Sequence, residues 1–192
     1  MTIQSFPAVS HEQKISGWGR CIDKILWQEH LSPINVTFMH RYRPNVAAIV
    51  QNAAGQILVC ERIDIAGAWQ FPQGGIDPGE SPRQALEREM VEELSMGPEY
   101  YRVLSQKGPY RYLIGEGKTK KGYHGQEQEY FLLQFTGEET HINVKTPDQE
   151  FISCKWIDPA QFDEGWLPPM KVEVYRQVMK DFFGVEIRNA LS

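Results

Sequence analysis

Three glutamates with helical spacing, Glu89, Glu92 and Glu93, are the side chains of this sequence best suited to chemistry. Residues three and four positions apart are neighbours on a helix, so these carboxylates share one face. Like charges at that spacing destabilise a helix by roughly 0.2–0.5 kcal/mol, so the cluster needs a cause. Two explanations are open: a solvated face of good helix formers, or oxygen ligands for a hard divalent cation.

The stretch around them, QFPQGGIDPGESPRQALEREMVEELSM at residues 70–96, predicts a glycine-rich turn followed by a helix. Ser81 is expected to cap the helix, with Gln84 at capping-box spacing. The helix should run to about Leu94 and end at Gly97-Pro98. Its apolar stripe consists of Leu86, Met90 and Leu94. The turn favours the cation explanation, because such an ion keeps water that phosphates can displace.

Within this stretch, residues 74–96 resemble the Nudix signature, G-x5-E-x7-R-E-U-x-E-E-x-G-U, where U is an aliphatic residue. The fixed positions that match are Gly74, Glu80, Arg88, Glu89, Glu92 and Glu93. Ser95 stands where the signature has the glycine that ends the helix, and we expect Gly97 to serve instead. The resemblance runs from about Arg41 to Phe183 and implies hydrolysis of a pyrophosphate bond.

Three flanking motifs narrow the resemblance: YRPNV from Tyr42, WQFPQGG from Trp69 and HGQEQ from His124. They look like the branch that holds asymmetric dinucleoside tetraphosphate hydrolases and bacterial RNA pyrophosphohydrolases. The leading hypothesis is a metal-dependent enzyme that cleaves diadenosine tetraphosphate asymmetrically to ATP and AMP. The alternative is an RNA 5′-pyrophosphohydrolase, which acts on the 5′ end of RNA. The flanks argue against a nucleotide-sugar or oxidised-nucleotide substrate, and the intact glutamates argue against a silent binding module.

The resemblance assigns the metal ligands to Glu89, Glu92, Glu93 and Glu150, with Mg²⁺ as the cofactor and Mn²⁺ as a substitute. Glu89, Glu93 and Glu150 are the expected catalytic carboxylates, one of which would orient or deprotonate the attacking water. Bound ions would neutralise the phosphates and lower the pKa of that water. Read without the resemblance, Glu150 is a surface charge at the start of a strand. Arg88 is expected to orient the carboxylates.

The same resemblance places further residues along a substrate pocket: Gln73, Gly74, Gln126 and Gln128. Arg43 is expected to reach a phosphate, and Tyr112 to lie near the nucleobase or a phosphate. Lys121 is an alternative phosphate clamp, and Arg62 is expected to stack on the base. Met170 stands where the branch often has a base-stacking aromatic residue. Because stacking is normally worth about 1–3 kcal/mol per base, this difference tips the prediction towards the dinucleotide.

Residues 115–125, GEGKTKKGYHG, combine glycines with Lys118, Lys120 and Lys121. One interpretation is a solvated hairpin loop. The other is a mobile basic flap that closes over phosphates, because glycine permits movement and ammonium groups attract polyphosphate.

Length and composition indicate one domain, with room for a core and an appendage, and a cytoplasmic protein without a membrane partner. The apolar runs are shorter than the roughly 18 residues of a membrane span, and the N-terminus lacks the pattern of a signal peptide. Cys21, Cys60 and Cys154 lack metal-type spacing, so we expect reduced, mostly buried thiols. Most of the net charge of −5 lies between Gly74 and Met96, where bound cations would offset it.

Residues 1–40 are predicted to be an N-terminal extension, and residues 41–192 the Nudix domain. The extension reads as a polar tail, a helix at about 20–31 and a strand at about 34–40. It either covers the core or contacts a second copy, so a monomer and a homodimer stay open. The domain's other expected elements are strands at 46–51, 56–61, 101–105, 110–113, 129–135 and 151–157, and a helix at 171–183. They predict an α/β fold, with an α/β/α sandwich around a mixed β-sheet.

Overall fold

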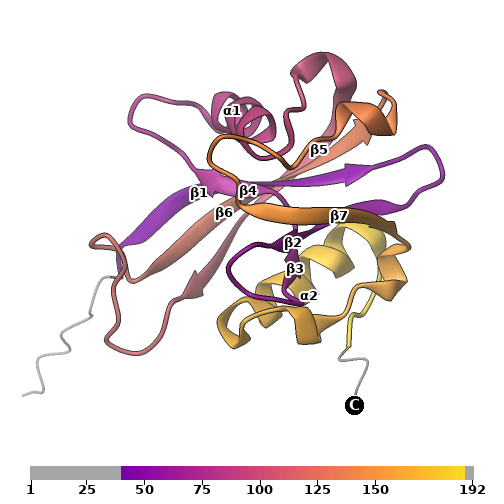
Figure 1. Cartoon of the computed structure of the whole chain (residues 1–192). Coiled ribbons are helices and arrows are strands. Elements are labelled where there is room, and N and C mark those ends of the chain that lie inside the picture. The colour runs from indigo at the N-terminus through magenta and orange to yellow at the C-terminus, as the bar shows by residue number, and fades with distance from the viewer. Residues whose placement is uncertain (1–39, 189–192) are drawn as a thin grey trace, which may run out of the picture. The chain divides into compact units, whose positions relative to one another are not determined.

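The computed structural model describes residues 40–188, so the elements expected within the first 39 residues lie outside the described part of the chain. Two helices, α1 (Pro82–Leu94) and α2 (Pro169–Phe183), lie on opposite sides of one sheet (Figure 1). This is the α/β/α sandwich that the sequence predicts. Among residues 40–188, neither helix is long and apolar enough to span a membrane.

The sheet has seven strands, and β1 lies at its centre. The strands are β1 (Tyr42–Gln51), β2 (Ile57–Arg62), β3 (Trp69–Gln70), β4 (Gln73–Gly75), β5 (Tyr101–Leu113), β6 (Gly125–Phe135) and β7 (Phe151–Ile157). The order is β3-β2-β1-β6-β5, with β4 paired to β1 and β7 to β2. Only β1 and β6 run parallel, so the sheet is mixed as expected. Short 3₁₀ turns are η1 (Pro98–Tyr100), η2 (Glu139–His141), η3 (Pro159–Gln161) and η4 (Glu164–Trp166).

The core lies on both faces of β1, as its continuous apolar run indicates. Its alternate residues Val46, Ala48 and Val50 pack in the cluster that contains α1. Ala47 and Ile49 pack in the cluster that contains α2. Packing on both faces therefore fixes the register of β1 in the sheet. It also fixes the position of the polar N-terminal end of this strand.

The strand β5 is continuous, although the sequence predicts two short strands there. Its pairing with β6 shifts register between Val103 and Ser105 and again between Lys107 and Tyr110. Gly108 and Pro109 fall in the second shift, where a residue without an N–H is tolerated. These bulges allow one continuous strand to include Gly108 and Pro109, residues that in the sequence suggest the end of a strand.

The capping box of α1 forms as predicted: Gln84 N–H donates to Ser81 Oγ at 3.3 Å, and Ser81 N–H donates to Gln84 Oε1 at 2.9 Å. The helix ends at Leu94 as predicted, but the role expected for Gly97 is wrong, because Gly97 has an ordinary φ of −71°. Ser95 itself takes the left-handed conformation, with φ 55°. The reversal comes there because Met96 is fully buried and its N–H donates to the carbonyl oxygen of Met90 at 3.1 Å.

Cys60 and Cys154, distant in sequence, face each other across β2 and β7. Both thiols are free; Cys60 is buried and Cys154 half-buried. Burial raises the pKa of the Cys60 thiol. These two cysteines therefore fit the expectation of reduced thiols, while Cys21 lies outside the described residues.

Candidate active site

A cleft of about 720 Å³ opens where β4, the second half of α1, the β5–β6 hairpin and the start of α2 meet. It brings together most of the predicted site residues, namely Arg43, Arg62, Gln73, Gly74, Glu89, Glu92, Tyr112, Lys121, Gln126, Glu150 and Met170. Glu93 and Gln128 are not among the lining residues, because both are buried beneath it. The volume is in the range of small-molecule sites.

Position 74 requires glycine, because the carboxylate of Glu89 fills the space that a side chain there would need. A β-carbon on Gly74 would lie 1.7 Å from the carboxyl carbon of Glu89. The guanidinium of Arg43 leaves no room for a side chain at Gly75, because a β-carbon there would lie 2.0 Å from Arg43 Nη2. The glycine pair thus lets a carboxylate and a guanidinium approach the backbone of β4 closely.

Glu93 projects from α1 beneath β4 and is only 3% exposed. Its Oε2 accepts a hydrogen bond from the backbone N–H of Gln73 at 2.9 Å, while its Oε1 is buried without a partner. Burial, with Glu150 and Glu89 nearby, raises the pKa of Glu93 to about 10. A buried carboxylate oxygen without a donor is costly, so this atom is suited to a cation.

Arg88 organises the carboxylates around it, as the sequence predicts. It donates to both Glu80 oxygens at 2.9 Å, to Glu89 Oε1 at 2.7 Å and to Glu92 Oε2 at 3.1 Å. A fifth hydrogen bond reaches the carbonyl oxygen of Gly75 at 2.7 Å. These contacts hold the pKa of Glu80 down to about 2. The glycine turn and the helix are therefore tied together through one guanidinium.

Glu150 reaches the cleft from the segment just before β7 and is exposed. Its carbonyl oxygen accepts from the N–H of Ile63 at 2.9 Å, which fixes it beside the β2–β3 loop. Burial raises the pKa of Glu89, with Glu92 and Glu150 adding to that rise and Arg88 opposing it. Glu150 is thus close enough to the α1 carboxylates to act on their charge, although it is 57 residues or more away in sequence.

The carboxylates suit a divalent cation in chemistry, although they are not gathered into a finished cage. Within residues 40–188, no three His, Cys, Asp or Glu side chains are arranged to hold a metal ion. Arg88 occupies oxygens of Glu89 and Glu92, so a cation there would compete with its guanidinium. The orphaned Oε1 of Glu93 and the hard oxygen donor set both fit such an ion.

Basic side chains also line the cleft. Lys120 and Lys121 reach it from the β5–β6 hairpin, whereas Lys118 does not line it. Lys121 has a left-handed φ of 53°. Tyr112 lies on the same side and donates to Gln126 Oε1 at 2.6 Å. Carboxylates and ammonium groups therefore line the same cleft, a combination that suits a polyphosphate bridged by cations.

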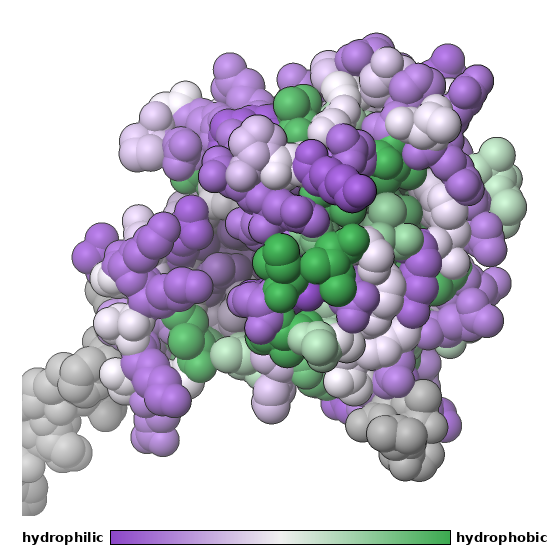
Figure 2. All heavy atoms as spheres, in the orientation of Figure 1, coloured by the Kyte–Doolittle hydropathy of each residue, from purple (hydrophilic) through white to green (hydrophobic). Residues whose placement is uncertain are grey.

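Exposed apolar side chains form a further part of the lining. Ile63, Ile65 and Met170 are 53%, 49% and 39% exposed, and all three line the cleft. Figure 2 shows hydrophobic side chains near the centre of an otherwise hydrophilic face, where β2, β3 and their connecting loop lie in Figure 1. Arg62, the last residue of β2, pairs with Asp64 of that loop, at 2.7 Å between Nε and Oδ1. Its guanidinium is thereby oriented beside an apolar surface that suits a nucleobase.

Two buried residues of the cleft, Lys171 and Gln70, are not predicted as site residues from the sequence. Lys171 is 6% exposed, and its Nζ donates to Gln70 Oε1 at 3.2 Å. Lys171 reads as the polar start of an amphipathic helix, and its neighbour Met170 is the position that the resemblance singles out. The available signal was a lysine beside a predicted site residue.

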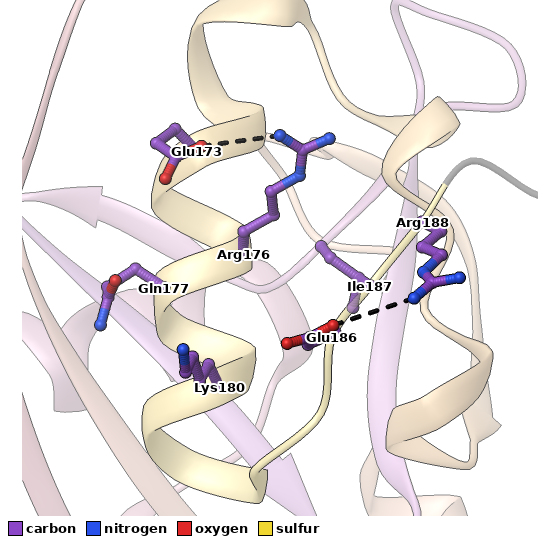
Figure 3. A pocket seen from close by; sticks show the side chains of 7 residues that line it. All are labelled: Glu173, Arg176, Gln177, Lys180, Glu186, Ile187 and Arg188. Atoms are coloured by element: carbon purple, nitrogen blue, oxygen red, sulfur yellow. Dashed lines mark ion pairs between the residues drawn. The ribbon is translucent and has the colours of Figure 1, made fainter.

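A smaller pocket of about 360 Å³ lies between α2 and the segment that follows it (Figure 3). Most of its charged side chains are paired with each other: Arg176 pairs with Glu173 at 3.6 Å, and Arg188 with Glu186 at 3.9 Å. Arg176 also pairs with Glu164 at 2.8 Å. None of the predicted site residues lines this pocket, so we assign the chemistry to the larger cleft.

Comparison with known proteins agrees with this geometry. Residues 41–182 match the family model of the NUDIX domain. An RNA pyrophosphohydrolase from Erythrobacter litoralis is 39% identical over 150 residues, covering 74% of this chain and 91% of that protein. An RNA pyrophosphohydrolase from Proteus mirabilis is 40% identical over 154 residues, covering 73% of this chain and 82% of that protein.

Solved structures share the fold at lower identity. An Ap4A hydrolase from C. elegans, in a binary complex, has a TM-score of 0.53 at 18% identity and covers 74% of this chain and 98% of its own. A NUDIX hydrolase from Nitrosomonas europaea has a TM-score of 0.54 at 19% identity and covers 77% and 93%. The family match spans most of the chain and includes every residue of the glutamate-bearing turn and helix. The chain therefore belongs to the Nudix family and is a pyrophosphohydrolase.

Proposed function

We propose that the chain is an RNA 5′-pyrophosphohydrolase, which converts a 5′-triphosphate end to a 5′-monophosphate. The sequence-based preference for diadenosine tetraphosphate rests on Met170 alone. Two relatives at 39% and 40% identity carry the name RNA pyrophosphohydrolase, and this supports the alternative better. The likeness to the C. elegans Ap4A hydrolase is at 18% identity and concerns the fold.

The observation that carries the proposal is the mixed lining of one cleft. Carboxylates, ammonium groups and exposed apolar side chains all line it. A 5′-triphosphate end combines a dense negative charge with the first bases of the RNA. It would lie with its phosphates towards the glutamates and with a base against Met170 and Arg62.

Nudix hydrolases generally need divalent metal ions, and we assign Glu89, Glu92, Glu93 and Glu150 as the ligands, with Mg²⁺ as the ion and Mn²⁺ as its substitute. Such ions supply charge neutralisation on the phosphates and lower the pKa of the attacking water. Glu93 offers its unpartnered Oε1, and Gln73 holds the other oxygen in place. Glu150, exposed at the rim, is the carboxylate best able to accept a proton from water.

The chain's own cations would hold the substrate along the cleft. Arg43 lies against β4, beside the carboxylates, and Lys121 and Lys171 also line the cleft. Tyr112 and Gln126, which are hydrogen-bonded to each other, form a further part of its wall. Water attacks the innermost phosphorus of the triphosphate. The bond from that phosphorus to the next bridging oxygen breaks, and this oxygen leaves as part of pyrophosphate. The RNA keeps its innermost phosphate, and the proton of the water passes to a carboxylate.

Product analysis tests this function. RNA carrying a labelled 5′-triphosphate is incubated with wild type and with Glu93→Gln in Mg²⁺, and the ends are resolved by chromatography. We expect 5′-monophosphate ends from wild type and a loss of turnover by orders of magnitude in a folded Glu93→Gln protein. Intact triphosphate ends with wild type would contradict the proposed function. Near-wild-type turnover by Glu93→Gln would contradict the assigned chemistry.

A further inference from the structure

The buried polar side chains of this protein are connected to one another. Within residues 40–188, the polar or charged side chains that are nearly inaccessible are Asn45, Gln70, Glu93, Gln128 and Lys171. Gln73 joins them: its side chain contacts those of Gln128 and Gln70, and its backbone N–H donates to Glu93. A buried polar chain of this kind fixes the orientation of each member, because every donor must face an acceptor.

This series of hydrogen-bonded side chains begins at Tyr130, a fully buried residue of β6. The hydroxyl of Tyr130 donates to Gln128 Oε1 at 3.1 Å. The amide oxygen of Gln128 therefore faces Tyr130, and its nitrogen faces the other way. That nitrogen donates to Asn45 Oδ1 and to Gln73 Oε1, both at 2.8 Å.

The same orientation passes on to the cleft. With its oxygen turned to Gln128, Gln73 presents its nitrogen to Gln70 Oε1 at 3.0 Å. Gln70 must then point its oxygen towards Gln73, and the same oxygen accepts from Lys171 Nζ at 3.2 Å. An ammonium group only donates, so a reversed Gln70 would place an NH₂ group against it and leave both without a partner.

We propose that Gln128, Gln73 and Gln70 are positioning residues that keep an acceptor oxygen against Lys171 and so fix its ammonium as an anion contact of the cleft. Gln128 does not line the cleft, so it acts through the other two. The inference rests on the proposed function for the substrate, a polyphosphate chain. The ammonium has three donors and one hydrogen bond to the protein, which leaves donors for phosphate oxygens.

The surroundings of Lys171 make the acceptor matter. Burial lowers the pKa of Lys171 to about 7; Arg62 and Lys120 lower it further, while Glu93 and Glu150 oppose them. Near neutral pH its charge therefore depends on each partner it has. Because hydrogen bonds to charged groups are strong, we expect the loss of this acceptor to change the affinity for an anion about tenfold.

We call the series of hydrogen bonds from Gln128 through Gln73 and Gln70 to Lys171 the relay. Calorimetry with inorganic tripolyphosphate at pH 7 in EDTA tests it without RNA or turnover. We expect Gln128→Met and Lys171→Met each to weaken binding roughly tenfold, and the double variant to be no weaker than Lys171→Met alone. Lys180→Met is the matched control. It removes an exposed lysine of the same helix that lines the other pocket (Figure 3), and it should bind as wild type.

Two results would overturn the relay: wild-type affinity in Gln128→Met, or an equal loss from Gln128→Met with and without Lys171. If Gln128→Met does not fold by circular dichroism, Gln70→Met carries the same cycle, because it removes the acceptor itself. The readout also separates this inference from the proposed function. RNA left unprocessed by wild type would refute the function alone, whereas uncoupled tripolyphosphate binding would refute the relay alone.

Discussion

Gly74 and Glu89 occupy one space: the carboxyl carbon of Glu89 lies 1.7 Å from where a β-carbon of Gly74 would be. Gly74 belongs to β4 and Glu89 to α1, so the strand and helix meet through a glycine and a carboxylate. The contact explains why the turn and the helix form one motif. The glycine makes room for the acid, and the helix fixes where the acid lies.

Gly74→Ala should therefore lower activity while the fold survives. The methyl group would push away the end of the Glu89 side chain, which can rotate, rather than a backbone atom. We expect kcat in Mg²⁺ to fall at least tenfold with a small change in melting temperature. Gly97→Ala is the control, because its β-carbon would meet only the exposed carboxylate of Glu99, at 2.3 Å from Oε2. Equal activity of Gly74→Ala and Gly97→Ala would show that Glu89 need not hold its place.

Glu93 should make the metal-free protein less stable as the pH rises. Its pKa is about 10 in the folded chain against an ordinary value of 4.5. Between these values the folded state holds a proton that the unfolded state has released, so stability falls with rising pH. Glu93→Gln keeps a neutral side chain in both states. Urea unfolding in EDTA should show the advantage of Glu93→Gln over wild type growing from pH 5 to pH 8. A constant difference between the two proteins would contradict the burial of this acid.

Lys171 should impose the opposite pH dependence. Its pKa is about 7 when folded and 10.5 ordinarily, so above pH 7 the folded chain loses a proton that the unfolded chain keeps. The cost of burying the charge is complete below pH 7 and disappears as the pH rises towards 10.5. Lys171→Met should be more stable than wild type at pH 6, and its advantage should shrink by pH 9. An advantage that is absent at pH 6 would mean that the ammonium is not buried.

The basic hairpin offers a prediction with a built-in control. Lys120 and Lys121 line the cleft, whereas Lys118 on the same loop does not. Replacing Lys120 and Lys121 together with glutamine should raise KM for triphosphorylated RNA and reduce its dependence on salt, because fewer cations face the phosphates. Lys118→Gln should leave both quantities unchanged. Equal effects of the two changes would indicate a general surface field, and no effect of either would leave a solvated loop.

Ser95→Gly should stabilise the protein by roughly 0.5–1 kcal/mol. Ser95 holds the left-handed conformation at the end of α1, with φ 55°, where glycine avoids the steric penalty of a β-carbon. Ser95→Ala provides the comparison, because it retains the β-carbon and so should gain nothing. Thermal unfolding measures both. A melting temperature for Ser95→Gly at or below that of Ser95→Ala would contradict a left-handed cap at this residue.

The turn and helix at the site were predictable because their signals are local. Ser81 and Gln84 form the expected capping box, and Glu89, Glu92 and Glu93 lie on α1 at the expected helical spacing. Ser95 was misjudged in favour of Gly97, because the sequence shows which residue accepts a left-handed conformation easily, whereas the buried Met96 decides where the chain must turn.

The second layer of the cleft could not be derived in this way. Lys171 is buried against Gln70, which lies 101 residues away, and Gln128 reaches Asn45 across 83 residues. Burial of a polar side chain depends on partners from other strands, and no periodicity within one element reports it. The resemblance places Gln128 along the pocket, whereas its side chain is buried beneath the cleft and does not line it.

A competition assay tests the central claim most directly. Wild-type protein in Mg²⁺ is given 5′-triphosphate RNA and diadenosine tetraphosphate in one mixture, and both products are followed by chromatography to obtain the ratio of the two kcat/KM values. We predict that RNA ends become 5′-monophosphates with the higher kcat/KM. Conversion of diadenosine tetraphosphate to ATP and AMP while the RNA ends stay intact would contradict the account.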